Sequence, residues 1–208
     1  MSEKSKVIIF DFDGVIVDSF KPLYEINRSA AEKIGKSLSE DAYSAFFSGN
    51  IHKKLKDFIG PDEEKNRLFT EHKYKIFSDI YNERTVKLFD FSAEMIRTLG
   101  DLAELTIVSS APDVLIADVL KNAQLDGYFK NISGINKNGK RMVITERLDP
   151  KKDFYFVTDT AGDLSEVEGL ELTSLGITWG FHDEKQLLEA RPTYVVKDYK
   201  ELMKLVAE

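Results

Sequence analysis

The chain alternates short, nearly continuous apolar runs with segments in which apolar residues recur every three or four positions. Runs of the first kind predict strands, at residues 7–10, 105–109, 129–133, 154–159, 176–181 and 194–196. Segments of the second kind predict helices, at residues 92–99, 112–123, 141–147, 164–170, 184–190 and 199–206. Strands that are apolar throughout are typical of a parallel sheet covered by helices on both faces. The pattern therefore predicts an α/β fold with a parallel sheet core.

Residues 20–88 interrupt this alternation with a helical pattern that contains no strand-like segment. Leu23, Ile26 and Ala30 follow one another at spacings of three and four, so they share one face of a helix. The sequence thus predicts two domains, a core formed by residues 1–19 and 89–208 and an all-helical cap domain formed by residues 20–88. The two connections between them are expected to act as hinges.

Composition narrows the classes of function. The 208 residues carry a net charge of −7, which argues against a nucleic-acid partner because binding a phosphate backbone calls for a basic face. No apolar run approaches the roughly 20 residues needed to cross a bilayer, and no apolar leader precedes the first strand. The absence of cysteine excludes disulfides and thiolate chemistry and suits an intracellular protein. We expect a cytoplasmic monomer or homodimer without a membrane or nucleic-acid partner.

Polar residues follow the predicted strands at the sheet edge where ligands usually bind. In an open parallel sheet, ligands collect outside the carboxyl ends of the strands. Two carboxylates and a glycine at a strand end are unfavourable in a hydrophobic core and typical of a binding or catalytic site. The polar segments are Asp11-Phe12-Asp13-Gly14, Ser109-Ser110, Lys140 at a helix start, and Asp159 followed by Asp163.

These residue types suit phosphoryl chemistry. Clustered carboxylates fit Mg²⁺ better than zinc, because Mg²⁺ prefers a few carboxylates together with water and phosphate oxygens. A phosphoryl group would be held by the metal, by Lys140, and by Ser109 with the N–H groups near Ser110. Without cysteine or a histidine cluster, the available nucleophile is a carboxylate, whose attack on phosphorus gives an aspartyl-phosphate. The expected partner is a small phosphorylated metabolite.

The order and spacing of these segments resemble the haloacid dehalogenase superfamily. The likeness is to its Mg²⁺-dependent members of the phosphoglycolate phosphatase and β-phosphoglucomutase type, which have a Rossmann-like core and a helical cap after the first strand. It covers nearly the whole chain. The resemblance implies that Asp11 is the nucleophile and that Asp13 is the general acid and base, whose backbone carbonyl also contacts the metal.

The same resemblance assigns the later segments. It places Ser109 at the second motif, Lys140 at the third, and Asp159 and Asp163 at the fourth. The implied catalytic residues are Asp11, Asp13, Ser109 and Lys140, and the implied metal ligands are Asp11, Asp13, Asp159 and Asp163.

Two positions depart from the family pattern. Thr158 stands where the family usually has glycine, and its side chain could crowd the loop. Arg141 follows Lys140 where proline is frequent, and Lys137 is close enough to compete for the lysine's role.

The predicted cap supplies candidates for substrate binding. A glycine-containing segment joins two of its helices, and in the resembling family such a segment faces the site. A solvated helix start explains the same residues equally well. His182, by contrast, is expected at the surface. The candidate substrate-binding residues are Gly49, Asn50, His52 and Lys53, together with Ser110.

The predicted function is that of a Mg²⁺-dependent phosphatase acting through Asp11. Asp13 argues against a dehalogenase or a phosphonate-cleaving enzyme, which do not need a second aspartate. Two alternatives stay open: a sugar phosphomutase of the β-phosphoglucomutase type, and a non-catalytic relative that binds a phosphorylated ligand.

Overall fold

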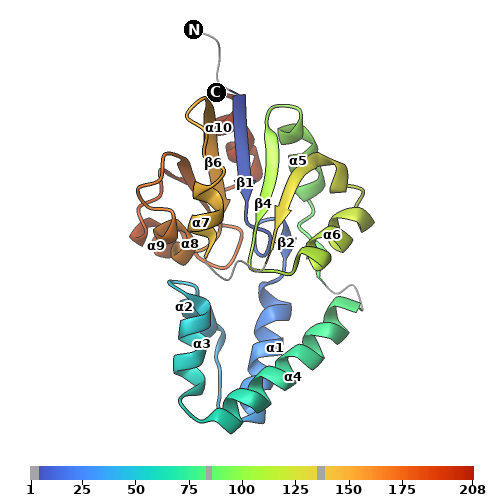
Figure 1. Cartoon of the computed structure of the whole chain (residues 1–208), viewed down its shortest axis with the longest axis vertical. Coiled ribbons are helices and arrows are strands. Elements are labelled where there is room, and N and C mark those ends of the chain that lie inside the picture. Colours follow the sequence, from blue (N-terminus) through green and yellow to red (C-terminus); the bar gives the residue numbers. More distant parts are fainter. Residues whose placement is uncertain (1–4, 83–85, 135–138) are drawn as a thin grey trace.

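The computed structural model describes residues 5–82, 86–134 and 139–208. A sheet-containing lobe and a helical lobe lie end to end (Figure 1). The sheet has six strands in the order β5-β4-β1-β6-β7-β8, and every neighbouring pair is parallel. Its strands are β1 (Ser5–Phe10), β4 (Glu104–Val108), β5 (Phe129–Ser133), β6 (Lys152–Thr158), β7 (Thr173–Ile177) and β8 (Tyr194–Val196). This confirms the predicted α/β fold with a Rossmann-like parallel sheet.

Strand β1 lies at the point where the strand order reverses. The chain leaves it toward β4 and β5 on one side, and later crosses to β6, β7 and β8 on the other. Phe10 at the end of β1 lies opposite both Ile107 and Val157 of its two neighbours. The carboxyl ends of three strands therefore meet at one level, which is where an open α/β sheet binds ligands.

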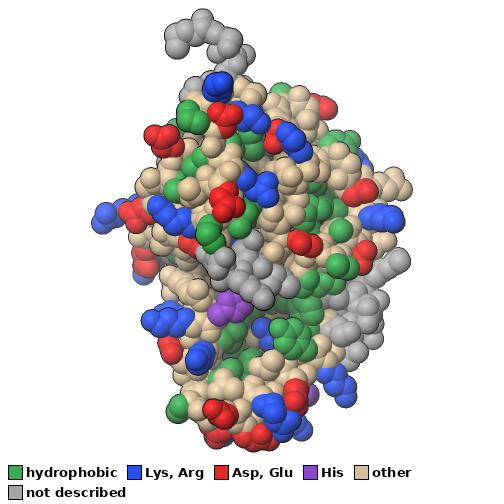
Figure 2. Space-filling model, viewed as in Figure 1, with side chains coloured by type: hydrophobic (Ala, Val, Ile, Leu, Met, Phe, Trp, Pro, Cys, Tyr) green, Lys and Arg blue, Asp and Glu red, His purple; other side chains and the backbone are tan. Residues whose placement is uncertain are grey.

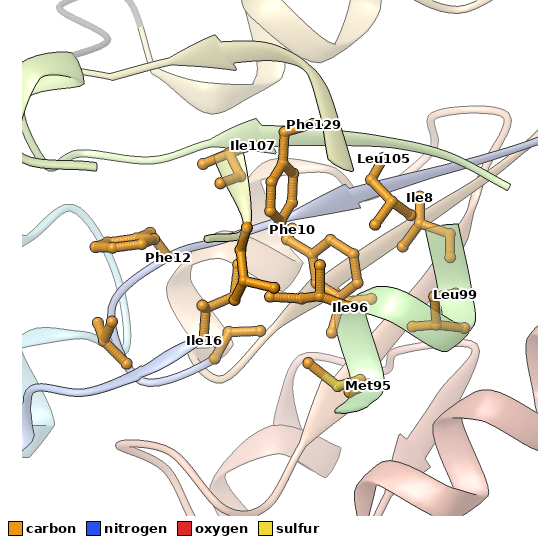
Figure 3. Close-up of a cluster of buried hydrophobic side chains, with 14 of the residues drawn as sticks. Ile8, Phe10, Phe12, Ile16, Met95, Ile96, Leu99, Leu105, Ile107 and Phe129 are labelled. Atoms are coloured by element: carbon orange, nitrogen blue, oxygen red, sulfur yellow. The ribbon is translucent and has the colours of Figure 1, made fainter. Parts of the chain in front are cut away.

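Alternate residues of β1 pack into hydrophobic clusters on opposite faces of the sheet. Ile8 and Phe10 join a cluster with Met95, Ile96 and Leu99 of one helix (Figure 3). Burying each large apolar side chain contributes about 1.5–3 kcal/mol, so this packing fixes the end of β1 firmly. The opposite face buries Val7, Ile9, Ile144, Phe154, Phe156 and Val167. The covering helices are α5 (Ser92–Gly100), α6 (Asp113–Asn122), α7 (Lys140–Thr145), α8 (Ala161–Glu166), α9 (Glu184–Glu189) and α10 (Tyr199–Ala207), with a 3₁₀ turn at Asp126–Tyr128.

The helical lobe has a hydrophobic cluster of its own. Its helices are α1 (Phe20–Lys33), α2 (Glu40–Phe46), α3 (Ile51–Ile59) and α4 (Glu63–Asn82). Their buried side chains include Tyr24, Ala30, Ile34, Tyr43, Leu55, Ile59 and Phe69. The predicted helical insertion is thus present in the structure, while the domain boundaries drawn from the sequence stay a prediction.

The two connections between the lobes pair with each other. Strand β2 (Val17–Asp18) lies antiparallel to β3 (Lys87–Leu88), with Val17 opposite Leu88. The expectation of no strand between residues 20 and 88 is wrong at this point, because a strand of two residues leaves no periodic pattern in the sequence.

Two predicted elements are displaced along the chain. The strand expected at residues 176–181 lies at Thr173–Ile177, and the apolar run continues into a loop where Trp179 donates a hydrogen bond to the Val15 carbonyl at 3.2 Å. Helix α8 begins at Ala161, because the Thr160 hydroxyl caps its start. The first shift moves residues 178–181 from a strand into a loop, and the second brings Asp163 into the first turn of a helix.

Among the described residues, no helix is both long and apolar enough to cross a membrane.

Candidate active site

The first motif forms a tight turn at the end of β1. The Asp11 amide donates to the Val157 carbonyl at 2.9 Å, which continues the sheet by one residue. Phe12 is fully buried and points into the core, so the side chains on either side of it face away from the core (Figure 3). Gly14 then turns the chain with a positive φ of 73°. The alternation directs Asp11 and Asp13 to the same edge.

Lys140 joins the first and fourth motifs. Its Nζ lies 2.6 Å from Asp11 Oδ2 and 2.6 Å from Asp163 Oδ2. Burial lowers the pKa of Lys140, but the charges of Asp11 and Asp163 outweigh it and raise the pKa above its ordinary value. The ammonium therefore stays charged between the two carboxylates. The alternative lysine, Lys137, lies outside the described residues.

Asp163 is held by the residue that departs from the family pattern. The Thr158 hydroxyl donates to Asp163 Oδ2 at 2.9 Å and accepts from the Thr160 amide at 3.4 Å. Burial acts to raise the pKa of Asp163, but Lys140 outweighs it and lowers the pKa below its ordinary value. The expectation that Thr158 crowds the loop is wrong, because its side chain is fully buried and hydrogen-bonded there.

Asp159 lies at the end of β6 in a space that two glycines leave open. Its Oδ2 accepts a hydrogen bond from the Phe181 amide at 2.8 Å. A Cβ atom at Gly14 or at Gly180 would overlap the Asp159 carboxyl group. Burial, and next the charge of Asp11, raise the pKa of Asp159 well above its ordinary value. Asp159 is thus a buried carboxyl group in a narrow slot. Among the described residues, Lys140 is the cation whose charge acts to lower its pKa.

The donor set of this edge fits a divalent cation. Among the described residues, four carboxyl groups share one ammonium, and Asp13 Oδ1 and Asp159 Oδ1 are buried without a hydrogen-bond partner. Burial raises the pKa of Asp11 to about 7 and also raises that of Asp13. Buried carboxylate oxygens need a charged partner, and hard oxygen donors of this kind suit Mg²⁺. Within the described residues, no three carboxylate or imidazole groups converge as a preformed metal site, and Lys140 stands between Asp11 and Asp163.

Ser109 and Ser110 follow β4, which neighbours β1. Ser109 is buried, and its Oγ accepts from the Ala111 amide at 3.2 Å. Ser110 is exposed. Because β4 and β1 end level, Ser109 lies at the same edge as Asp11.

The candidate substrate-binding residues of the helical lobe lie in different environments. Gly49 reaches the fourth-motif loop, since a Cβ at Gly162 would lie 2.8 Å from the Gly49 carbonyl oxygen. Asn50 caps α3 by accepting from the Lys53 amide at 3.0 Å, a local structural role. His52 and Lys53 are exposed in the first turn of α3. Figure 2 shows hydrophobic side chains gathered where the two lobes meet.

The sequence prediction missed the loop after β7. His182 is 1% exposed, so the expectation of a surface histidine is wrong. Its Nδ1 accepts from the Ala161 amide at 2.9 Å, and its Nε2 lies 3.0 Å from the Ser44 carbonyl oxygen. The only trace in the sequence is Gly180 within an aromatic run, a pattern that equally describes a strand.

Comparison with known proteins places the chain in a family. Residues 8–149 match the family model of haloacid dehalogenase-like hydrolases. A protein of Vibrio cholerae named phosphoglycolate phosphatase is 23% identical over 97% of this chain and 96% of its own length. A phosphorylated carbohydrates phosphatase of Thermotoga maritima is 27% identical, over 98% of this chain and 99% of its own.

Solved structures share the fold. The crystal structure of a predicted phosphatase from Clostridium acetobutylicum superposes with a TM-score of 0.83 at 21% identity and covers 99% of both chains. The family match spans more than half of the sequence and includes the first three motifs. The chain therefore belongs to the haloacid dehalogenase-like hydrolase family.

Proposed function

We propose that the protein is a Mg²⁺-dependent phosphatase that hydrolyses a small phosphomonoester through an aspartyl-phosphate on Asp11. The observation that carries the proposal is the contact of buried Lys140 with Asp11 and Asp163, both at 2.6 Å, beside the Asp13 and Asp159 oxygens that have no hydrogen-bond partner among the described residues. Within the part of the chain that the structure describes, one ammonium faces four carboxyl groups, so the edge suits further positive charge. A metal ion and a phosphoryl group together complete such a site.

In the proposed reaction, a carboxylate oxygen of Asp11 bonds to phosphorus while the ester P–O bond breaks. The departing oxygen takes a proton from Asp13. Water then attacks the aspartyl-phosphate, Asp13 takes the proton of that water, and phosphate leaves with Asp11 restored. Lys140 holds Asp11 in place and lies beside the phosphoryl oxygens, with Ser109 at the neighbouring strand end. When bound to Asp11, Asp159 and the Asp13 carbonyl, with Asp163 supporting, Mg²⁺ would supply charge that stabilises the phosphoryl oxygens.

The names of the relatives favour a small phosphorylated metabolite as substrate. Two relatives are named for phosphoglycolate and for phosphorylated carbohydrates, and these names support that class without choosing within it. We further propose that residues 20–88 act as a cap that closes over the site, with Gly49, Asn50, His52, Lys53 and Ser110 nearest the non-phosphate part of the substrate. The cytoplasmic location and the monomeric or dimeric state stay predictions.

The test is a hydrolysis screen against a panel of phosphate esters. Phosphate release is measured with Mg²⁺, with a chelator, and with Mg²⁺ restored, and the protein is acid-quenched during turnover for peptide mass analysis. We expect Mg²⁺-dependent release and a phosphoryl adduct on the peptide that contains Asp11. Turnover that survives chelation, or an adduct elsewhere, would contradict the proposal. Phosphate transfer to a hexose phosphate would instead indicate the phosphomutase, and binding of Mg²⁺ and ester without release would indicate the non-catalytic relative.

A further inference from the structure

The loop between β7 and α9, residues 178–183 (the β7–α9 loop), contacts both lobes beside the candidate site. Its Phe181 amide donates to Asp159 Oδ2 at 2.8 Å, while the Phe181 carbonyl accepts from Ser44 Oγ of the helical lobe at 3.2 Å. The Phe181 ring also packs edge to face against Phe20 and Phe47 of that lobe, with ring centroids 5.1 Å and 4.8 Å away. One short loop thus holds a predicted metal ligand and the helical lobe together.

His182 makes the same kind of bridge with its imidazole. The Ala161 amide can only donate, so Nδ1 of His182 must be the acceptor of the 2.9 Å hydrogen bond. The proton of the neutral ring then lies on Nε2, which donates to the Ser44 carbonyl at 3.0 Å. The ring has both nitrogens satisfied in a single tautomer, and burial lowers its pKa in support of that neutral form.

The two partners of His182 belong to the elements whose relative position matters for the site. Ala161 is the first residue of α8, between Asp159 and Asp163, and its amide has no acceptor within that helix. The next amide, Gly162, donates across the lobes to the Phe47 carbonyl at 2.9 Å. A side chain at Gly162 would prevent this approach, since its Cβ would lie 2.6 Å from the Phe47 oxygen. The start of α8 is therefore held by the histidine on one amide and by the helical lobe on the next.

We propose that His182 is a positioning residue that couples closure of the helical lobe onto the sheet to the placement of the Asp159–Asp163 loop. Nε2 fixes α2 of the helical lobe through Ser44, and Nδ1 fixes the start of α8 through Ala161. When the helical lobe closes, the imidazole ring thus positions α2 and the start of α8 relative to each other. His182 touches neither the substrate nor the reacting atoms. The inference rests on the proposed function only where it links closure of the helical lobe to catalysis, because the coupling itself consists of contacts within this chain.

Two conservative variants separate the two halves of the bridge. In His182→Asn, the amide oxygen can replace Nδ1 and accept from Ala161, but the side chain is too short to reach Ser44. In His182→Gln, the longer amide can replace Nε2 and donate to Ser44, but it leaves Ala161 without its acceptor. Ser44→Ala is the matched control, because it removes the hydroxyl contact to Phe181 and keeps the Ser44 carbonyl that His182 uses.

Amide hydrogen exchange and Mg²⁺ binding give readouts that do not depend on turnover. We expect His182→Asn to speed exchange at the Gly162 amide about fivefold, as loss of one neutral hydrogen bond predicts, and to leave Mg²⁺ affinity unchanged. We expect His182→Gln to speed exchange at the Ala161 amide and to weaken Mg²⁺ binding by a similar factor. With substrate, His182→Asn should raise KM and spare kcat, and His182→Gln should lower kcat. Ser44→Ala keeps both hydrogen bonds of His182, so it should leave exchange at the Gly162 and Ala161 amides at the wild-type rate.

Equal effects of the Asn and Gln variants on both amides would overturn the proposal. If His182 only stabilised the fold, both variants would lower stability and speed exchange at the Gly162 and Ala161 amides alike. Exchange that follows the expected division in a protein without phosphatase activity would keep the coupling and reject the proposed function. Activity without the division would reject the coupling alone. His182→Ala, which should lose both contacts, is informative only if it folds, and the Asn and Gln pair decides the matter in either case.

Discussion

The two sides of the candidate site are built in different ways. On the sheet side, Lys140 lies 2.6 Å from both Asp11 and Asp163, with Asp11 and Lys140 buried and Asp163 half-buried. Asp11 follows β1, Lys140 begins α7, and Asp163 lies in the first turn of α8. On the helical side, His52 and Lys53 are exposed in the first turn of α3. The lobes also meet through contacts at one edge, around Phe181 and His182.

This contrast suggests that the sheet side carries out the chemical step and that the helical side selects the substrate. A buried cluster of charges cannot rearrange without exposing unpaired groups, so it suits chemistry that is the same for every substrate. Exposed side chains on a helix start can change at little cost in stability, so they suit selection among substrates. Substitutions on the sheet side are therefore expected to have the largest effects, and those on the helical side the smallest.

The largest effect is expected from Asp11→Asn. An amide of the same shape cannot attack phosphorus, so kcat on the best ester of the panel should fall at least about a thousandfold. Asp118→Asn, an exposed residue of α6, is the matched control and should leave kcat unchanged. Thermal unfolding of both variants checks that the loss is chemical. Turnover of Asp11→Asn at the wild-type rate would remove Asp11 from the mechanism.

Lys140→Met should weaken both activity and stability. Removing one partner of a buried ion pair leaves the other charge uncompensated, which typically costs about 3–5 kcal/mol, and here Asp11 and Asp163 both lose their partner. Denaturant unfolding at neutral pH measures the free energy, and phosphate release measures the activity. Lys137→Met is the control for the competing assignment. If it lowers kcat more than Lys140→Met does, the third motif belongs to Lys137.

Gly14→Ala should cost more than an equivalent change at Gly35. The two glycines have almost the same positive φ, 73° and 74°, so adding a Cβ strains φ at both. Among the residues that the structure describes, none has an atom within 4 Å of a Cβ at Gly35, whereas a Cβ at Gly14 would overlap the Asp159 carboxyl group. We expect a loss of about 1 kcal/mol for Gly35→Ala and a further 1–3 kcal/mol for Gly14→Ala from overpacking. Equal losses in unfolding experiments would mean that Asp159 moves away freely.

The sequence predicted the sheet side well for a physical reason. Apolar strands of a parallel sheet end at a common edge, so polar residues directly after them, such as Asp11 and Ser109, can be expected to meet. The sequence could not place the β7–α9 loop, because Trp179 and Phe181 after Ile177 continue the apolar pattern of the strand. Thr158 was also misjudged, since its hydrogen bond to Asp163 depends on a backbone path that the pattern does not contain.

The sequence says least about the helical side, where the smallest effect is expected. An exposed lysine at a helix start has the same pattern whether it binds substrate or water, and the structure leaves Lys53 exposed as well. If Lys53 contacts the substrate, Lys53→Ala should raise KM up to about fivefold, the range of an exposed ion pair, and leave kcat unchanged because the sheet side is untouched. Lys65→Ala, an equally exposed lysine of α4, should change neither.

The salt dependence of KM separates a real contact from a general effect of charge. A direct ion pair with the substrate makes KM rise with salt in the wild type and flattens that dependence in Lys53→Ala alone. The same flattening in Lys65→Ala would reflect only the charge of the lobe. A wild-type KM in Lys53→Ala would assign the lysine to solvent, and substrate selection would then fall to the more buried contacts around Gly49 and Phe47, where the helical lobe already meets the fourth-motif loop.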